Sequence, residues 1–363
     1  MEGPRSPNEA ELPHVLEFLN QKLRNEAPWS IAAEYPTAFN RNNLHNMRII
    51  ADEGKVLSHA VLKPLIIKSP HVIFKVGAIG SVVTHDEHRG QGLSTQIVKD
   101  CLKMATEQSC DIAILWTDLF DFYRRMGFEL AGNEVSFVIE EEFEANNEGL
   151  RFSTDPRVSP DAIYRLYSSH SINSVRTIEE TKKFLSIPQT KVYTAWESNG
   201  QLAAYAIEGK GIDLGGYLHE WGGSVSKLMA LFSFIRMQKG QPVTVICPRH
   251  ATNLIQQLEK LPVTKNHGFL GMIKLVNFDQ LSAKIKRAFR AEGVADIVLE
   301  KHPTQYVFGI GTDLYTINKE TDMVRLLFGP VDYRAMDMFK PETLDKLEKI
   351  LPLPLWIWGW DSI

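Results

Sequence analysis

Cysteine is scarce in this chain of 363 residues, which contains Cys101, Cys110 and Cys247 and no other. Their spacing fits neither a disulfide framework nor a metal site, and unpaired thiols suit a reducing compartment. We expect the three side chains to be buried as small apolar groups. The cysteine content therefore argues against a fold that depends on disulfide bonds.

The sequence also lacks long apolar runs and a strong excess of charge. No segment approaches the ~18 consecutive apolar residues that a membrane span needs, and residues 1–7 are polar, unlike a signal peptide. The net charge is −4, with 23% charged and 44% apolar residues, as in an ordinary soluble globular protein. We therefore expect a cytoplasmic protein that binds neither nucleic acid nor membrane. The length allows two or three domains.

The most informative stretch is a strand followed by a glycine loop and a helix. The pattern predicts a buried strand at 76–83, the loop Arg-Gly-Gln-Gly-Leu-Ser at 89–94, and a helix at 95–107. Such a loop leaves backbone N–H groups without internal partners at the start of the helix, where the helix dipole also favours anions. Gly90 and Gly92 allow a close approach of the main chain and a positive φ. The pattern predicts a pyrophosphate-binding loop.

Two common phosphate-binding loops do not fit these residues. A nucleotide P-loop needs Lys followed by Ser or Thr after its last glycine, whereas Leu93 and Ser94 follow Gly92. A dinucleotide-binding loop needs a third glycine, which is missing, although Asp111 lies near the distance expected for its acidic residue. The loop is therefore predicted to be an anion loop of another kind.

Together with a second segment, the loop resembles a known family. It follows the strand end Val82-Val83-Thr84 and precedes the segment Phe122-Tyr123-Arg124-Arg125-Met126-Gly127-Phe128. In this order the two segments resemble the acetyl-coenzyme A loop and the downstream Tyr-x-x-x-Gly-Phe segment of the GCN5-related N-acetyltransferases (GNAT). In that family the last loop position is usually Gly or Ala, whereas this chain has Ser94.

The resemblance implies that the chain binds acetyl-coenzyme A and transfers the acetyl group to a primary amine. Tyr123 would act as the general acid that protonates the leaving thiolate, with a core tyrosine as the alternative. The backbone N–H of Val82 or Val83 would polarise the thioester carbonyl. By resemblance, the residues that hold the coenzyme are Ser81, Val82 and Val83 along the pantetheine arm, and Arg89, Gly90, Gln91, Gly92, Leu93 and Ser94 around the pyrophosphate.

The predicted elements around the loop agree with the α+β fold of this family, a mixed and splayed β-sheet flanked by helices. A helix ending near Leu23 is expected behind a Ser or Asn cap. Strands at 47–51 and 56–64 read as a hairpin, followed by a strand at 72–83. A doubly wound sheet would instead alternate strand and helix from the outset. An acidic run at 140–149 is expected to close this catalytic domain, residues 1–147.

The rest of the chain is predicted to form two further domains. Residues 148–269 repeat the scheme, with Pro156 and Pro160 ahead of a helix at 161–169, but Gly222-Gly223-Ser224-Val225-Ser226-Lys227 stands where the anion loop would be. We expect a degenerate GNAT-like domain that shapes the acceptor pocket, with an unrelated α/β domain as the alternative. Residues 270–363 resemble the sterol-carrier-protein-like domain that ends the enhanced-intracellular-survival (Eis) branch of the superfamily.

Other candidate residues follow from the resemblance or from position. In the Eis branch the terminal carboxylate can act as a base, which here would be that of Ile363. Packing on a domain surface and a subunit interface are the alternatives for the apolar tail. Asp118 and Glu220 are candidate substrate residues, with helix capping and a surface position as the alternatives. His85 and His88 are expected to be surface residues, and we expect no metal site, because no third ligand is evident at metal spacing.

Three functions stay open from the sequence. The first is an N-acetyltransferase in which a small-molecule amine, for instance aminoglycoside-like or polyamine-like, attacks acetyl-coenzyme A directly in a ternary complex. The second is a non-catalytic acetyl-coenzyme A-binding regulatory module, and the third is a carrier of hydrophobic ligands. The sequence identifies neither the acceptor nor the oligomeric state, so a homo-oligomer stays open.

Overall fold

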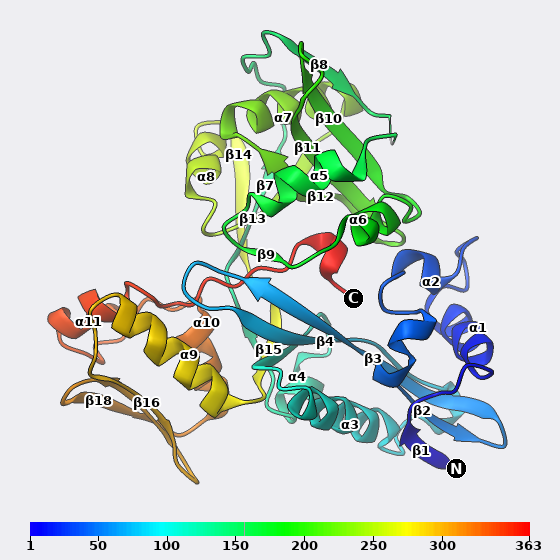
Figure 1. Cartoon of the computed structure of the whole chain (residues 1–363), viewed down its shortest axis with the longest axis vertical. Coiled ribbons are helices and arrows are strands. Elements are labelled where there is room, and N and C mark those ends of the chain that lie inside the picture. Colours follow the sequence, from blue (N-terminus) through cyan, green and yellow to red (C-terminus); the bar gives the residue numbers. More distant parts are fainter. Residues whose placement is uncertain (156) are drawn as a thin grey trace.

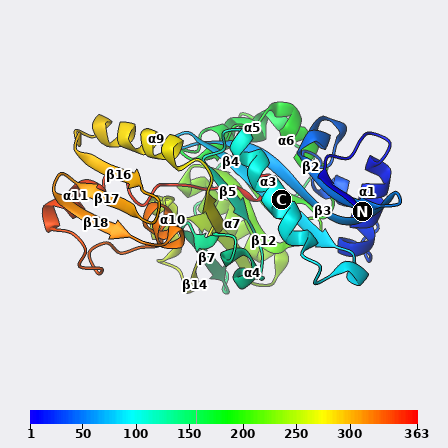
Figure 2. The same ribbon diagram turned by 90° about the horizontal axis from the view of Figure 1, so that it is seen from below.

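Three β-sheets with helices packed against them make up the computed structural model, which describes residues 1–155 and 157–363 (Figure 1). Pro156, expected ahead of the helix near residue 160, lies outside the described residues. The first sheet carries the glycine loop, the second lies above it in Figure 1, and the smaller third sheet lies to one side. Figure 2 shows this third part at one end of the molecule and the N-terminus at the other.

The first sheet is assembled from segments far apart in the chain. β2, β3 and β4 form an antiparallel meander, and β5 then pairs parallel to β4. The strand order is β1 (Glu2–Arg5), β2 (Met47–Asp52), β3 (Lys55–Lys68), β4 (Phe74–Thr84), β5 (Ile112–Leu115), β15 (Gly271–Leu275) and β6 (Glu129–Ala131), with the short β9 (Asn173–Ser174) paired to β3. This mixed sheet agrees with the expected arrangement and positions the loop after β4.

Each face of this sheet has its own apolar core because side chains alternate along the strands. On one face, Ile49 and Val61 pack with residues of α1 (Leu12–Leu23), α2 (Ile31–Glu34) and the short turn η1 (Arg41–Asn46). On the other face, Ala60 and Leu62 pack with residues of α3 (Leu93–Glu107) and α4 (Phe120–Arg124). The α1 helix begins after Glu11 without a side-chain cap, so the expected Ser or Asn cap is wrong.

The second sheet repeats the element order around β4 and β5. Its β10 (Lys191–Glu197), β11 (Leu202–Lys210) and β12 (Asp213–Gly223) are antiparallel, and β13 (Val243–Pro248) is parallel to β12 after the helix α7 (Val225–Lys239). The remaining elements of this part are β8 (Leu150–Ser153), β14 (Val263–Gly268), α5 (Pro160–Ser168), α6 (Ile178–Phe184) and α8 (Thr252–Leu258).

Three strands among the described residues cross between these sheets, and one of them is β9, which lies between β8 and β10 in the chain but pairs with β3. β7 (Glu134–Ile139) follows β6 in the chain but pairs with β13 and β14 in the second sheet. β15, which follows the second sheet in the chain, returns to the first and pairs with β5 and β6. The expected boundaries at 147/148 and 269/270 therefore do not separate the strands of one sheet from those of the other.

The last part contains a three-stranded antiparallel sheet and three helices. Its α9 (Phe278–Ala291) buries Leu281, Ile285 and Phe289 at helical spacing. The other elements are β16 (Ile297–Lys301), β17 (Tyr306–Ile310), β18 (Asp313–Ile317), α10 (Glu320–Phe328) and α11 (Pro341–Leu347). None of the helices in the described ranges is long and apolar enough to cross a membrane.

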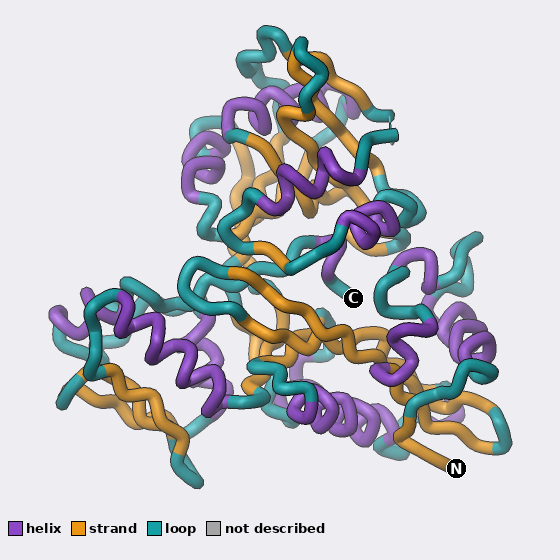
Figure 3. Tube along the Cα trace, viewed as in Figure 1, coloured by secondary structure: helices purple, strands orange, loops and turns teal. Residues whose placement is uncertain are grey.

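The tail, residues 353–363, runs from this last part into the space between the first two sheets, where the C-terminus lies in Figure 1. It has little regular structure apart from η3 (Gly359–Asp361), as Figure 3 shows by its loop colour. Trp358, Trp360 and Asp361 are at most 2% exposed. The expectation that this apolar segment is not left in water is confirmed.

The three cysteines are also buried and unpaired, as expected.

Glu134 at the crossing into β7 makes stability depend on pH. Burial raises its pKa from 4.5 to about 7, whereas the unfolded chain ionises near the ordinary value. Between these values unfolding releases a proton, so stability falls as pH rises. We expect Glu134→Gln to raise the melting temperature at pH 8 and to change it little at pH 5. Glu141→Gln on the exposed connector is the control, and equal effects of Glu134→Gln at both pH values would contradict this prediction.

Candidate active site

β4 and β5 separate at the edge where the glycine loop begins. They pair in parallel only from Val76 and Ile112 to Ala78 and Ile114 among the described residues. β4 then continues to Thr84, while β5 ends at Leu115. The backbone of β4 after Ala78 thus has no strand partner on the β5 side, and an extended ligand can bond there as an additional strand would.

A bulge shapes β4 within this splayed segment. Val61 of β3 pairs with Gly80, but His59 pairs with Val83, so β4 carries one extra residue between them. Ser81 has a φ of +49°, a left-handed conformation that costs energy for a residue other than glycine. The Nδ1 of His59 lies 2.9 Å from the carbonyl oxygen of Ser81, and the Nδ1–H tautomer donates to it. Ser81, Val82 and Val83 are all partly exposed.

The loop after β4 has the geometry of an anion site. Gly90 and Gly92 have φ values of +78° and +80°, and a Cβ at either position would meet open space. Gly92 is the N-cap of α3 and has no side chain to cap it, so the first N–H groups of the helix stay available for an anion. Arg89 and Gln91 are exposed. These residues fit a pyrophosphate.

Leu93 and Ser94 tie this loop to the strands. The helix starts at Leu93, earlier than expected, and Leu93 is buried in the core under the sheet. The hydroxyl of Ser94 lies 2.7 Å from that of Thr84, which in turn lies 2.9 Å from that of Ser58. Ser94 therefore fixes the start of α3 to the end of β4, a contact that Gly or Ala at this position would not make.

Tyr123 lies on α4 with its ring buried and edge-on to Phe122 and Phe128, at centroid distances of 4.9 and 5.9 Å. It packs in the same core as Val82 and Leu93. Among the described residues its hydroxyl makes no hydrogen bond, yet its oxygen is not sealed from solvent. Burial, and to a lesser extent Cys101, raises the pKa of Tyr123 to about 12. The phenol therefore stays protonated and has a free hydrogen to donate.

Ile363 lies against the same segment of β4. A Cβ on Gly80 would come within 2.9 Å of the terminal carbon of Ile363 and 3.1 Å of its oxygen. Ile363 packs with Val61 and Val83, on the face of the sheet opposite to Tyr123. The two candidate catalytic groups thus approach the bulge of β4 from opposite faces. A position of the carboxylate beside the hydroxyl of Tyr123 stays a prediction.

Arg176 fixes the tail two residues before its end, a contact that the sequence did not predict. Its guanidinium is 2.7 Å from Asp361 and 2.7 Å from Glu220, and all three residues are at most 4% exposed. Burial alone would raise the pKa of Asp361, but the charge and hydrogen bonds of Arg176 outweigh burial and lower it. Tyr167 donates a further hydrogen bond of 3.1 Å to Asp361.

Two buried lysines hold the tail backbone. Lys210 Nζ donates to the carbonyl oxygens of Gly359 and Ser362 at 2.9 and 2.5 Å. Lys63 Nζ lies 3.4 Å from the carbonyl oxygen of Asp361. Burial lowers the pKa of both lysines, and the nearby charge of Lys63 lowers that of Lys210 further. The last residues are therefore held from the first sheet and the second at once.

Neither candidate substrate residue has the structural role that its alternative predicted. The expected surface position is wrong for Glu220, because it is 0% exposed and its two oxygens accept from Arg176; its substrate role stays a prediction. Asp118 is exposed, but it does not cap α4, whose N-cap is Leu119 without a side-chain hydrogen bond. Thr117 Oγ1 instead accepts from the Leu119 N–H at 3.0 Å.

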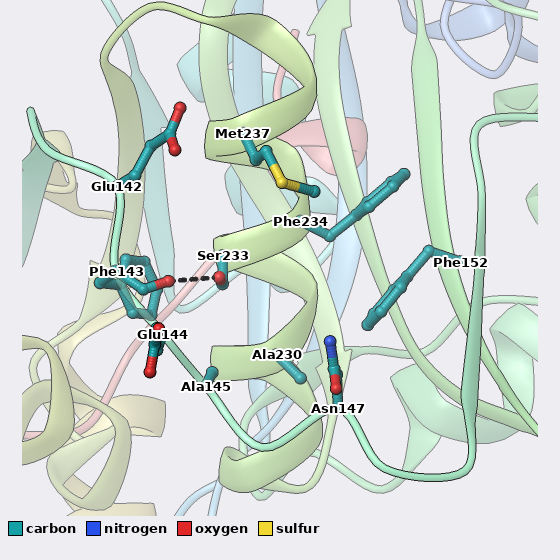
Figure 4. A pocket seen from close by; sticks show the side chains of 10 residues that line it. All are labelled: Glu142, Phe143, Glu144, Ala145, Asn147, Phe152, Ala230, Ser233, Phe234 and Met237. Carbon is teal, nitrogen blue, oxygen red and sulfur yellow. Dashed lines mark hydrogen bonds between the residues drawn. The ribbon is translucent and has the colours of Figure 1, made fainter.

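At the corresponding place in the second sheet, β12 and β13 also separate after two paired residues, but a side chain bridges the gap. Trp221 on β12 donates from Nε1 to the carbonyl oxygen of Ile246 on β13 at 3.0 Å, so its indole bridges the two parallel strands. A cavity of about 320 Å³ stays beside it, lined among others by His170 and His250. A cavity of about 660 Å³ lies between the connector 142–147 and α7, where Phe152 stacks on Phe234 (Figure 4). Neither cavity is lined by a residue of the loop 89–94.

Comparisons with known proteins agree with this geometry. Residues 4–131 match the family model described as an acetyltransferase (GNAT) domain, so the first part of the chain carries such a domain. No curated protein sequence matches the chain at a significant level.

Solved structures share the fold over nearly the whole chain. A GCN5-related N-acetyltransferase from Anabaena variabilis has a TM-score of 0.67 at 15% identity, with 99% of both chains covered. A probable N-acyltransferase from Enterococcus faecalis has a TM-score of 0.65 at 14% identity, covering 99% of this chain and 98% of that one. Eis1 from Mycobacterium abscessus has a TM-score of 0.64 at 11% identity, covering 99% of both chains. At these identities the likeness concerns the fold.

The buried cluster around Arg176 generates a stability prediction. We expect Arg176→Met to lower the free energy of unfolding by about 3–5 kcal/mol, because it leaves Glu220 and Asp361 buried without their partner. The triple variant Arg176→Met, Glu220→Gln, Asp361→Asn should recover most of this loss, since no uncompensated charge stays buried. Urea unfolding of both variants at pH 7 measures the difference. Equal stability of Arg176→Met and the unaltered protein would contradict the prediction.

Proposed function

We propose that the acetyltransferase (GNAT) domain of this chain is active as an N-acetyltransferase, which transfers acetyl from acetyl-coenzyme A to a primary amine of a small molecule. The observation that carries the proposal is the combination of three features in β4, in the loop after it and in the apolar core that both share with α4. These are the splayed and bulged strand, the loop with positive φ at Gly90 and Gly92, and a protonated Tyr123 with a free hydroxyl.

The coenzyme is proposed to lie along β4 and over the start of α3. Ser81, Val82 and Val83 offer backbone groups to its pantetheine arm, as the unpaired edge of β4 supports. The pyrophosphate is held by N–H groups of residues 89–94 and by the charge of Arg89. When bound, acetyl-coenzyme A supplies a thioester whose acyl carbon accepts an amine.

Protons are handled by two groups of this chain. The terminal carboxylate of Ile363 accepts the proton that the acceptor amine loses as it attacks directly in a ternary complex. Tyr123 donates its phenolic proton to the departing sulfur, and the raised pKa of Tyr123 keeps that proton in place at neutral pH. The backbone N–H of Val82 or Val83 stabilises the developing charge on the acyl oxygen.

Arg176 and Lys210 act in this proposal as positioning residues. They hold Asp361 and the carbonyl oxygens of Gly359 and Ser362, so that the next atoms of the chain reach Gly80. Preorganisation of this kind avoids the entropy of ordering a free tail at every turnover. The second, GNAT-like part of the chain thus contributes to the site without binding coenzyme, which the bridge from Trp221 to Ile246 supports.

The acceptor is proposed to be a cationic amine, of which aminoglycosides and polyamines are examples. The terminal carboxylate of Ile363 against β4 and the exposed Asp118 ahead of α4 are negative groups that would attract such an amine. The alternative is a regulatory module that binds acetyl-coenzyme A without turnover.

The third part of the chain favours a further alternative, a carrier of hydrophobic ligands of the sterol-carrier-like type. A cavity of about 640 Å³ there is lined by Leu326, Met336 and Met338, among others. Calorimetry with acetyl-coenzyme A separates this alternative from the first two functions, because only those require coenzyme binding. Release of free thiol with a panel of amines then separates the enzyme from the regulatory module.

Tyr123→Phe tests the proton donor. We expect kcat to fall by about 10²–10⁴-fold, the usual contribution of a general acid, with unchanged calorimetric affinity for acetyl-coenzyme A. Because the pKa of Tyr123 is raised to about 12, the unaltered protein should show no loss of kcat from this group between pH 7 and about 10. Tyr315→Phe, at an exposed tyrosine of β18, is the control. Full turnover of Tyr123→Phe would exclude this residue as the acid.

A one-residue extension tests the terminal carboxylate. Adding a glycine after Ile363 keeps the charge but moves it by about 3.5 Å along the chain, so we expect kcat to fall by at least about tenfold with coenzyme affinity unchanged. Ile363→Val keeps the carboxylate in place and should retain turnover. Deletion of residues 361–363 is a poorer test, because it also removes the partner of Arg176. An unchanged kcat in the extended chain would exclude the terminal carboxylate as the base.

A further inference from the structure

The turn between β4 and the glycine loop brings together three residues with metal-binding side chains. His85 occupies the N-cap position of the short 3₁₀ turn η2 (Asp86–His88) without a side-chain hydrogen bond, and His88 ends the turn. A 3₁₀ turn has three residues per turn, so side chains at i and i+3 lie on the same side. The ring centroids of the two histidines are accordingly 5.9 Å apart.

Glu87 supplies a third ligand atom to this pair. Its Oε2 is 3.9 Å from Nδ1 of His85, and one ligand atom from each of the three residues lies within 4.8 Å of the others. From the sequence we expected no third ligand near the two histidines. This expectation is wrong, because Glu87 lies beside them. Asp86, the fourth residue of the turn, is engaged elsewhere, with Lys22 at 2.5 Å and Arg89 at 2.7 Å.

The histidine nitrogens themselves point to a ligand. Nδ1 of His85 and Nδ1 of His88 are both sealed from solvent and have no hydrogen-bond partner among the described residues. Buried polar atoms in proteins are nearly always paired, and an unpaired one calls for a bound water or ion. Two such atoms on adjacent imidazoles, with a carboxylate beside them, match the ligands of a borderline-soft metal.

We propose that His85, Glu87 and His88 form a binding site for a Zn²⁺-like transition-metal dication, with the remaining coordination position open to water. Zn²⁺ takes imidazole nitrogen and carboxylate oxygen at about 2.0–2.2 Å in a tetrahedral arrangement. This requires ligand atoms about 3.4 Å apart, so the side chains of the three residues have to rotate toward one another, and that of Glu87 is 84% exposed and free to do so. Mg²⁺ and Ca²⁺ prefer six or more oxygen ligands and do not suit this set.

The position of the site links it to the loop that follows. The backbone N–H of His85 donates a hydrogen bond to the carbonyl oxygen of Leu57 on β3 at 2.7 Å. The backbone N–H of Arg89 donates to the carbonyl oxygen of Asp86 at 3.3 Å. A metal held by residues 85, 87 and 88 would lock the turn from which Arg89 and Gly90 emerge. The metal site itself does not rest on the proposed function, because it concerns residues outside the loop and the tail.

Zn²⁺ titration of the full-length protein by calorimetry, after chelator treatment and without coenzyme, tests this inference. The expected result is a one-to-one isotherm that weakens at least about tenfold in His85→Ala and in His88→Ala, since even the loss of residues that only support a ligand costs about 10–100-fold. Glu87→Gln should weaken it as well. Mg²⁺ at the same concentration should give no heat of binding.

The chain contains 11 histidines, so a matched control is needed. His45→Ala removes an exposed histidine outside this turn and should leave the isotherm unchanged. Melting temperatures of all variants without metal verify that the turn variants fold. The inference is overturned if the unaltered protein gives no one-to-one isotherm, or if His88→Ala binds Zn²⁺ as tightly as the unaltered protein does.

Discussion

The ion cluster of Arg176 with Glu220 and Asp361 is the constraint on which the arrangement of this molecule depends. The buried guanidinium of Arg176 is tolerated because two carboxylates and the rings of Tyr167 and Phe184 surround it. The centroid of the Tyr167 ring is 3.7 Å from the Cζ atom of Arg176. Asp361 belongs to the tail and Glu220 to β12, and Arg176 lies two residues after β9, which pairs with β3. One side chain therefore joins the first sheet, the second sheet and the end of the chain.

This constraint gives the site its composite character. The glycine loop, the bulged β4 and Tyr123 all lie within the segment that matches the GNAT domain. The group that packs against the open backbone of β4 at Gly80 comes instead from the last residue, and the anchors that hold it come from both sheets. A β4 residue with a side chain at position 80 would collide with the terminus, so the glycine is needed there for close approach.

Local patterns predicted the elements that depend on nearby residues. The strand, the loop and the helix around Gly90 and Gly92, including their positive φ, follow from residues adjacent in the chain. The hydrogen bonds from Arg176 to Asp361 join residues 185 positions apart, and no periodicity or spacing encodes such a contact. For Glu220, a candidate substrate residue, the sequence offers a surface position as the alternative because carboxylates rarely lie inside without a partner, and its partner is 44 positions away.

The site at His85 and His88 shows the same limit at short range. The spacing of the two histidines is visible in the sequence. The 3₁₀ turn that brings Glu87 close to them is not, and on an α-helix residues at i and i+2 would not face each other. The strand exchange was not foreseen either. Backbone pairing between β15 and β5 leaves no signature in either strand beyond an apolar run, which is compatible with many neighbours.

The placement of β15 has a consequence for how the protein is made. This strand lies between β5 and β6 in the first sheet, yet it is synthesised after every strand of the second sheet. Until the ribosome has released residue 275, β5 exposes an unpaired edge of apolar residues to other nascent chains. The two sheets must then complete their topologies together, as a single cooperative unit of high contact order. We expect this order of strands to slow folding and to leave the apolar edge of β5 prone to wrong pairing until β15 has been made.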